Sequence, residues 1–245
     1  MTPLIAIPVR LAATRLPNKP LADVNGTPLV IHVWRRAVAA GIARVVVACG
    51  DREIADVVTK AGGEAVMTDP SLPSGSDRVA AAADIVDPGG RYDVVVNLQG
   101  DVINAEPADL KALLTPLDAT DAAVSTVATE MHPALYADPN SVKIALSIKP
   151  GARAGRALYF SRATIPYGDG PLYHHFGLYG FRREALRRFV RMEPSQLEKR
   201  ERLEQLRALE AGMRVDVALI DHVLYEINTE EDLVRERARL AAQQG

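Results

Sequence analysis

Short runs rich in apolar and β-branched residues, separated by helix-like stretches, are the feature of this sequence that most restricts its fold. In the first half of the chain these runs lie at Leu4–Val9, Arg44–Cys49 and Asp93–Leu98, with a shorter one at Ala65–Met67. The stretches between them carry apolar residues at helical spacing, and helices are expected at Val30–Ala40, Arg52–Ala61 and Asp77–Val86. Strands that are apolar on both faces are typical of a parallel sheet covered by helices on both sides. We therefore predict an α/β fold with a mostly parallel, Rossmann-like sheet.

The second half of the chain breaks this alternation and predicts a smaller β-rich insertion. Strands are expected at Val142–Leu146, Ala157–Phe160, Gly177–Phe181 and Val215–Ile220. Helices are expected at Glu198–Ala211, where Leu203, Leu206 and Leu209 fall near one stripe, and at Thr229–Ala242, with Thr229 as its N-cap. The pattern predicts a single domain over residues 1–245, with the insertion at roughly 125–185.

Charge and cysteine content exclude several classes of protein. The 29 Lys and Arg residues nearly balance the 31 Asp and Glu residues, and a net charge of −2 argues against binding to nucleic acid or an anionic membrane. The longest apolar runs are about five residues, whereas a membrane span needs ~20, and no signal peptide is visible. The single cysteine, Cys49, cannot form an intrachain disulfide or a cysteine zinc site, and no histidine lies near it in sequence to activate it. We expect a cytoplasmic, globular protein.

Two segments at the ends of predicted strands carry chemistry. Arg10, Arg15 and Lys19 lie within ten residues after the first strand. Because ligands of parallel sheets bind beyond the carboxyl ends of the strands, these cations are placed to neutralise a triphosphate, although an ordinary surface loop has similar spacing. Asp101 follows a buried strand in Gln99-Gly100-Asp101 and is placed to hold Mg²⁺ beside a nucleotide; a capping or turn aspartate is the alternative.

Seven motifs, taken in order, resemble those of the 3-deoxy-manno-octulosonate (Kdo) cytidylyltransferases, also called CMP-Kdo synthetases. They are Pro8–Leu21, Ser74–Arg78, Asn97–Asp101, Pro139–Lys143, Tyr159–Pro166, His175–Gly180 and Leu203–Arg207. The resemblance spans nearly the whole chain. It implies a nucleotide-sugar-transferase fold and a Mg²⁺-dependent reaction in which CTP and an acidic sugar give a CMP-sugar and pyrophosphate. It also implies a homodimer formed through the β-rich insertion.

The resemblance carries residue roles onto matching positions. Arg10, Lys19 and Asp101 would be catalytic. The nucleotide would be bound by Arg10, Arg15, Lys19, Ser74, Arg78, Gln99 and Asp101. The acceptor would be surrounded by Gln99, Arg162, His175, Tyr179, Glu204 and Gln205, and the metal would be held by Asp101 and Asn228. Taken singly, His175 would more often be a structural histidine and Tyr179 a packing residue of a strand, and Glu204 and Gln205 would belong to a solvated helix face.

Four positions depart from the family pattern, and all four fall on functional loops. Ala13 stands where the family has a serine, Gly50 where it has an aspartate, and Val102-Ile103 where it has a Glu-Pro or Leu-Pro pair. Asn228 stands in place of a second metal-binding aspartate, and its amide oxygen brings no negative charge to Mg²⁺.

These departures leave three interpretations open. The first is transfer of CMP to Kdo. The second is a paralogue that transfers CMP to a phosphonate such as phosphonoformate, whose extra charge would make a neutral Asn228 tolerable. The third is a non-catalytic nucleotide-binding homologue, against which the retained Arg10, Lys19, Asp101 and Glu204 argue.

Overall fold

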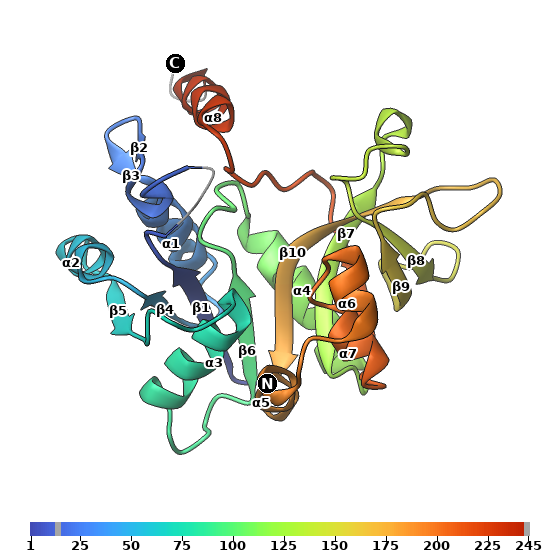
Figure 1. The fold of residues 1–245 in the computed structure, drawn as a ribbon, viewed down its shortest axis with the longest axis horizontal. Coiled ribbons are helices and arrows are strands. Elements are labelled where there is room, and N and C mark those ends of the chain that lie inside the picture. The colour runs from blue at the N-terminus through green and yellow to red at the C-terminus, as the bar shows by residue number, and fades with distance from the viewer. Residues whose placement is uncertain (13–15, 243–245) are drawn as a thin grey trace. The chain divides into compact units, whose positions relative to one another are not determined.

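The computed structural model describes residues 1–12 and 16–242 and divides into two compact units (Figure 1). One, here called the terminal unit, combines Thr2–Pro107 with Leu224–Gly245, two segments that are far apart in the sequence. The other, the central unit, consists of Ala108–Val223. Among the described residues, no helix is both long enough and apolar enough to cross a membrane.

The terminal unit contains the parallel sheet predicted from the apolar runs. Its strand order is β5-β4-β1-β6, and each neighbouring pair is parallel. Ile5 of β1 pairs with Val45 on one side and Val96 on the other, and its own side chain is completely buried. The strands are β1 (Pro3–Val9), β4 (Arg44–Cys49), β5 (Glu64–Met67) and β6 (Val94–Leu98). The helices packed on them are α1 (Leu29–Ala39), α2 (Arg52–Lys60) and α3 (Gly75–Val86).

The last part of the described chain returns to this unit. Val102 forms an isolated antiparallel bridge with Glu226, and the backbone N–H of Ile227 donates to the carbonyl of Asp101 at 3.1 Å. Helix α8 (Glu230–Ala242) follows, and the N–H of Asp232 in its first turn donates to the hydroxyl of Thr229. A buried cluster joins the two segments: Leu16, Val24, Leu29, Ile103, Ile227 and Leu233. Beside it lie the short elements η1 (Lys19–Leu21), β2 (Asp23–Val24) and β3 (Thr27–Pro28).

The central unit has a mixed sheet, so a mostly parallel sheet is not confirmed for the chain as a whole. In the order β10-β7-β11-β9-β8, only the β7–β11 pair is parallel among the pairings described; β10 also pairs antiparallel with β8. The β8–β9 connection is too short for the helical crossover that parallel neighbours require. The strands are β7 (Val124–Glu130), β8 (Lys143–Ser147), β9 (Ala154–Ser161), β10 (Tyr173–Arg182) and β11 (Val215–Leu219). The helices are α4 (Pro107–Ala119), η2 (Pro133–Leu135), α5 (Arg183–Arg191), α6 (Gln196–Glu201) and α7 (Leu206–Glu210).

The predicted continuous helix at Glu198–Ala211 is wrong. The chain forms α6 and α7 with a break at Arg202, whose φ of 56° lies in the left-handed region. Most other predicted elements are present, with ends that differ by a few residues, whereas α4, α5 and β7 have no counterpart in the sequence prediction. The proposed insertion at roughly 125–185 falls within the central unit, and its assignment to the acceptor or to a dimer stays a prediction.

Candidate active site

A pocket of about 210 Å³ opens in the terminal unit where β1 and β6 end. Its walls come from the segment after β1, the start of α3 and the segment after β6. Six of the residues predicted for the nucleotide line it: Arg10, Lys19, Ser74, Arg78, Gln99 and Asp101. Arg15 of the same set, like Ala13, lies outside the described residues. The fold therefore gathers side chains that are far apart in sequence onto one cavity, although their roles remain predictions.

Gly100 lets the two strand ends meet closely at this pocket. A Cβ at this position would lie 2.4 Å from Cγ1 of Val9 and 3.1 Å from the carbonyl oxygen of Pro8. Real Cβ atoms do not approach that closely, so only glycine fits without a shift of the backbone. The close packing fixes the position of the next residue, Asp101, relative to β1.

Arg78 is a buried cation in the wall of the pocket. Its side chain is 2% exposed, and Nη1 donates to the hydroxyl of Thr68 at 2.6 Å and to the carbonyl of Asp69 at 3.2 Å. Burial lowers the pKa of Arg78, and the nearby charge of Arg10 acts in the same direction. A Cβ at Gly50 would lie 2.9 Å from this guanidinium, so the glycine that departs from the family pattern leaves the space that Arg78 occupies.

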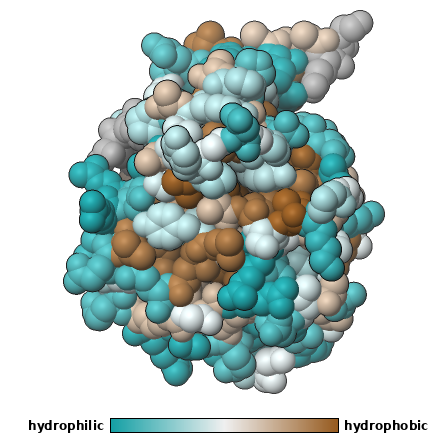
Figure 2. All heavy atoms as spheres, turned by 90° about the vertical axis from the view of Figure 1, so that its right-hand side faces the viewer, coloured by the Kyte–Doolittle hydropathy of each residue, from teal (hydrophilic) through white to brown (hydrophobic). Residues whose placement is uncertain are grey.

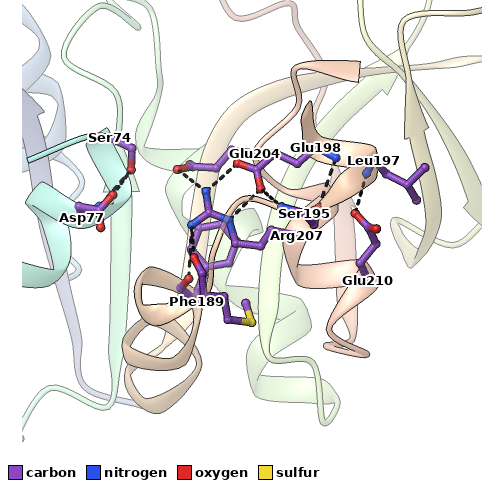
Figure 3. Close-up of polar contacts among 10 residues, drawn as sticks. Ser74, Asp77, Phe189, Ser195, Leu197, Glu198, Glu204, Arg207 and Glu210 are labelled. Carbon is purple, nitrogen blue, oxygen red and sulfur yellow. Dashed lines mark hydrogen bonds and ion pairs between the residues drawn. The ribbon is translucent and has the colours of Figure 1, made fainter. Parts of the chain in front are cut away.

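Ser74 and Gln99 are already engaged within the terminal unit. The hydroxyl of Ser74 donates to the carboxylate of Asp77 at 2.6 Å and accepts from its backbone N–H at 3.2 Å, which caps α3 (Figure 3). The side-chain nitrogen of Gln99 donates to Asn97 at 3.1 Å. Any contact of these two side chains with a nucleotide would add to a structural role.

Lys19, Asp101 and Asn228 meet at one side of the pocket region. The ammonium of Lys19 donates to Oδ2 of Asp101 at 2.5 Å and to Oδ1 of Asn228 at 3.3 Å. Lys19 and Asp101 side chains are 19% and 18% exposed, so the pair is largely shielded from water. Three of the four residues predicted to be catalytic or metal-binding are thus connected through the lysine.

The oxygen atoms of Asp101 and Asn228 are of the kind that Mg²⁺ prefers. Oδ1 of Asp101 is buried and has no hydrogen-bond partner among the described residues, which leaves an oxygen available to a cation. The described part of the chain brings together no group of three or more His, Cys, Asp or Glu side chains suited to a metal. Because Mg²⁺ is commonly held by one or two carboxylates plus phosphate oxygens and water, Asp101 and the amide oxygen of Asn228 fit it when a triphosphate supplies the other ligands.

Cys49 is not available as a nucleophile. It is completely buried at the end of β4, and burial raises the pKa of its thiol to about 12. The thiol therefore stays protonated at neutral pH, as expected from the sequence.

In the central unit, His175 is buried and neutral. Burial lowers the pKa of His175 to about 3, and the neighbouring His174 acts in the same direction. The amide nitrogen of Gln205, which can only donate, lies 3.5 Å from Nδ1, so the ring proton is on Nε2. Nε2 then donates to the hydroxyl of Thr126 at 3.1 Å, and that hydroxyl donates to the carbonyl of Leu178 at 2.9 Å. His175 can orient Gln205 and cannot offer a positive charge.

Tyr179, Glu204 and Gln205 line a cavity of only about 10 Å³ beside Phe181 and Phe189. Behind it, the guanidinium of Arg207 bonds to both carboxylate oxygens of Glu198, at 2.8 and 2.6 Å, and lies 3.9 Å from Glu204 (Figure 3). Arg207 thus connects α6 to the Glu204-Gln205 turn.

Most of the hydrogen-bond donors of Arg162 are already used within the protein. Its guanidinium donates to the carbonyls of Glu201 at 2.8 Å, Pro139 at 2.9 Å and Arg202 at 3.4 Å. Three of its five N–H donors are therefore used within the central unit, and two remain for an acceptor carboxylate. The structure places five of the six predicted acceptor residues in the central unit, whereas Gln99 belongs to the terminal unit.

Sequence analysis missed three residues that support this set. Thr126 had no motif to mark it, and Arg207 and Lys143 lay in recognised motifs without a role. Lys143 is completely buried and donates to the carbonyls of Asp138 at 2.6 Å and Arg162 at 3.1 Å. A lysine inside an apolar strand pattern was the signal available for it.

Comparison with known proteins agrees with this geometry. The family model described as cytidylyltransferase matches residues 4–215. A 3-deoxy-manno-octulosonate cytidylyltransferase of Paramagnetospirillum magneticum is 53% identical and covers 99% of each chain. One of Rhodospirillum centenum is 55% identical over 99% of this chain and 95% of the relative.

Solved structures agree as well. The structure of CMP:2-keto-3-deoxy-manno-octonic acid synthetase complexed with CTP matches with a TM-score of 0.90 at 33% identity, over 99% of this chain and 100% of the other. A nucleotidyl transferase of Methanothermobacter thermautotroptrophicus, at 16% identity, has a TM-score of 0.61 over 99% of each chain and shares the fold alone. On the strength of full-length identity above one half, the chain belongs to the 3-deoxy-manno-octulosonate cytidylyltransferase family.

Proposed function

We propose that this enzyme transfers CMP from CTP to Kdo and releases pyrophosphate. The observation that carries the proposal is the pocket in which Arg10, Arg78, Lys19 and Asp101 converge, in a chain more than 50% identical over its length to proteins named for this reaction. An acceptor hydroxyl forms a bond to the α-phosphorus of CTP, and the bond from that phosphorus to the pyrophosphate oxygen breaks. The hydroxyl proton passes to solvent, and pyrophosphate leaves with the electron pair of the broken bond.

The cations of the pocket serve the leaving group. Arg10 is exposed beside the pocket, and Arg78 supplies a second positive charge from its wall. Lys19 is neutralised by Asp101 in the structure, so a triphosphate oxygen can take the place of the carboxylate as its partner. Charge held in position before the reaction stabilises the developing pyrophosphate without reorganisation during the step.

We include Mg²⁺ in the proposal, held by Asp101 and Asn228. When bound, Mg²⁺ neutralises phosphate charge and orients the α-phosphate for attack. The buried oxygen of Asp101 that lacks a partner among the described residues supports this assignment. Lys19 stays close enough to share the same carboxylate, which limits how strongly the site binds a cation in the absence of nucleotide.

For the acceptor we propose the residues of the central unit. Arg162 retains donors for a carboxylate, and Gln205 is held in place by the neutral His175. Tyr179 and Glu204 provide further polar groups beside Gln205, with which they line one small cavity. Because His175 is neutral, it offers no charge to the acceptor. It acts on the hydroxyl or carbonyl groups of the acceptor only by orienting neighbouring side chains.

We also propose a homodimer formed through β8 and β9. Figure 2 turns to the viewer the side of the molecule on which these strands lie, and it shows hydrophobic residues gathered across the middle of that face. Leu158 of β9 is 58% exposed. Large exposed apolar patches mark interaction sites, so Leu158→Glu should convert a dimer to a monomer in light scattering, and an unchanged mass would contradict this interface. We propose a cytoplasmic location because CTP is made there.

Pyrophosphate release tests the proposed reaction. The protein is incubated with Mg²⁺ and each of CTP, UTP, ATP and GTP, with Kdo, with phosphonoformate and without an acceptor. Release with CTP and Kdo and little with the other nucleotides is expected. Equal rates with all four nucleotides would refute cytosine selectivity, and release with phosphonoformate in place of Kdo would assign the chain to the phosphonate alternative.

A further inference from the structure

The carboxamide of Asn228 is held at both of its ends. Its oxygen accepts from the ammonium of Lys19 at 3.3 Å, and its nitrogen donates to a carboxylate oxygen of Glu226 at 3.4 Å. The oxygen therefore faces the side on which Asp101 lies, because Lys19 contacts Asp101 at 2.5 Å. The nitrogen faces away from that side, toward Glu226.

The backbone explains why Glu226 reaches this amide. The segment runs extended past Asp101: Glu226 bridges Val102, and the N–H of Ile227 donates to the carbonyl of Asp101 at 3.1 Å. Side chains two positions apart in an extended chain point to the same side. Ile227 is 2% exposed and turns into the core, which leaves Glu226 and Asn228 together on the other side.

An amide at a cation site must be held in one orientation, whereas a carboxylate need not be. Only its oxygen can bind a cation, since the nitrogen carries two donor hydrogens. The terminal torsion of asparagine is broad and roughly two-fold, so both orientations are accessible unless neighbours select one. Lys19 selects the oxygen-inward orientation only while it remains there, and a triphosphate competes for its ammonium.

We propose that Glu226 is a positioning residue that holds the Asn228 carboxamide with its oxygen toward the cation site at Asp101. The inference rests on the proposed function in taking the cation to be Mg²⁺ and the nucleotide to be CTP. Partners that orient a metal ligand commonly change metal affinity 10–100-fold when they are removed. The negative charge of Glu226 also lies beside a ligand that brings none.

The first test measures CTP binding by calorimetry over a range of Mg²⁺ concentrations, without an acceptor, so that no turnover occurs. In Glu226→Ala, the Mg²⁺ concentration that half-saturates the effect on CTP affinity should rise about tenfold. Glu226→Gln, whose side-chain oxygen still accepts from the amide, should stay close to the wild type. No change in Glu226→Ala, or equal loss in both variants, would overturn the proposal.

A double-mutant cycle separates orientation from general charge. In the Asn228→Asp background both ends of the side chain are oxygen, so Glu226→Ala should no longer raise the Mg²⁺ requirement. An undiminished effect in that background would overturn the orienting role. Glu231→Ala is the matched control, since it removes an exposed glutamate from the start of α8 and no described contact joins Glu231 to Asn228; it should behave as the wild type.

A second measurement stands apart from nucleotide and metal. The side-chain amide signals of Asn228 are identified in nitrogen-15 NMR spectra by their loss in Asn228→Asp. In Glu226→Ala the hydrogen of Nδ2 that is bonded to Glu226 should exchange faster with water, and unchanged exchange would overturn the contact. A wild-type protein that fails to bind CTP would refute the proposed function, while this measurement would still decide whether Glu226 holds the amide.

Discussion

Replacing Arg207 with methionine tests the network that connects α6 to the Glu204-Gln205 turn. The side chains of Arg207 and Glu198 are 8% and 12% exposed, and two hydrogen bonds of 2.8 and 2.6 Å join them. The guanidinium also lies 4.7 Å from the ring centre of Phe189 (Figure 3). Methionine fills a similar volume against this ring but leaves the Glu198 carboxylate without its cation.

The expected loss follows from that unpaired charge. Breaking a buried ion pair by removing one partner costs 3–5 kcal/mol, and because both partners retain slight exposure we expect about 3 kcal/mol. In the double variant Glu198→Gln, Arg207→Met the buried carboxylate at position 198 is gone, and only the more exposed Glu204, 3.9 Å from Arg207, loses a cation. Glutamine can still accept from the N–H of Ser195, as Glu198 does at 3.0 Å. Its loss should be about 1 kcal/mol, the size of an ordinary hydrogen bond.

The pH dependence has a definite sign. Burial raises the pKa of Glu198, but hydrogen bonds from Arg207 and from the Ser195 N–H outweigh it and hold the pKa below its ordinary value of 4.5. A carboxylate with a depressed pKa adds stability above the pKa of the unfolded chain and loses it as the pH falls through the folded value. In Arg207→Met burial dominates, so acidification from neutral pH towards 4.5 should recover part of the lost stability.

Urea unfolding followed by far-UV circular dichroism measures these free energies at each pH. The single variant should be less stable than the double variant at neutral pH. An Arg207→Met protein as stable as the wild type, or a double variant less stable than the single one, would refute the argument that an unpaired buried carboxylate is the dominant cost.

Three further outcomes are expected. Asp101→Ala should abolish turnover with a circular dichroism spectrum like that of the wild type, because its backbone contacts remain; retained turnover would place the cation elsewhere. Gly100→Ala should lower the free energy of unfolding in urea by about 1–3 kcal/mol, because its Cβ would overlap Val9; unchanged stability would show that the strand ends relax freely. The acceptor KM should show no transition between pH 5 and 8 that is caused by protonation of His175, because the pKa of His175 is about 3. The pH profile of the KM of His175→Asn, which has no imidazole at this position, is the control.

The parallel strands were predictable because their signal is local. Arg44–Cys49 was predicted with the bounds that the structure shows, since a β-branched run buried on both faces has few alternatives. The helix at Glu198–Ala211 was not, because its leucines, Leu203, Leu206 and Leu209, all follow Arg202 and no glycine or proline marks a break there. The left-handed turn at Arg202 accompanies tertiary contacts, among them the donation of Arg162 to the carbonyl of Arg202.

Part of the candidate site could also be predicted from the sequence, and part could not. Arg10 and Lys19 of the first loop and the aspartate after β6 follow strand ends, and the rule that ligands bind there predicted that they would lie at one site; all three line the pocket. The contacts of Arg207 with Glu198 and of Glu226 with Asn228 depend on where short segments turn, which no spacing records. The hydrogen bonds of Arg162 to backbone carbonyls could not be predicted either, because every residue has a carbonyl and the sequence does not show which one a side chain reaches.

The return of Leu224–Ala242 to the terminal unit sets an order of events during synthesis. Asp101 and its strand leave the ribosome early, but Asn228, Ile227 and Leu233 emerge only after all of Ala108–Val223 has been made. Until then Ile103 lacks its core partners Ile227 and Leu233, and Lys19 lacks its contact with Asn228. The strands of the central unit can therefore be synthesised and paired before the terminal unit is complete, and proteolytic loss of α8 and the segment before it would take Ile227 and Asn228 away from Asp101 and Lys19.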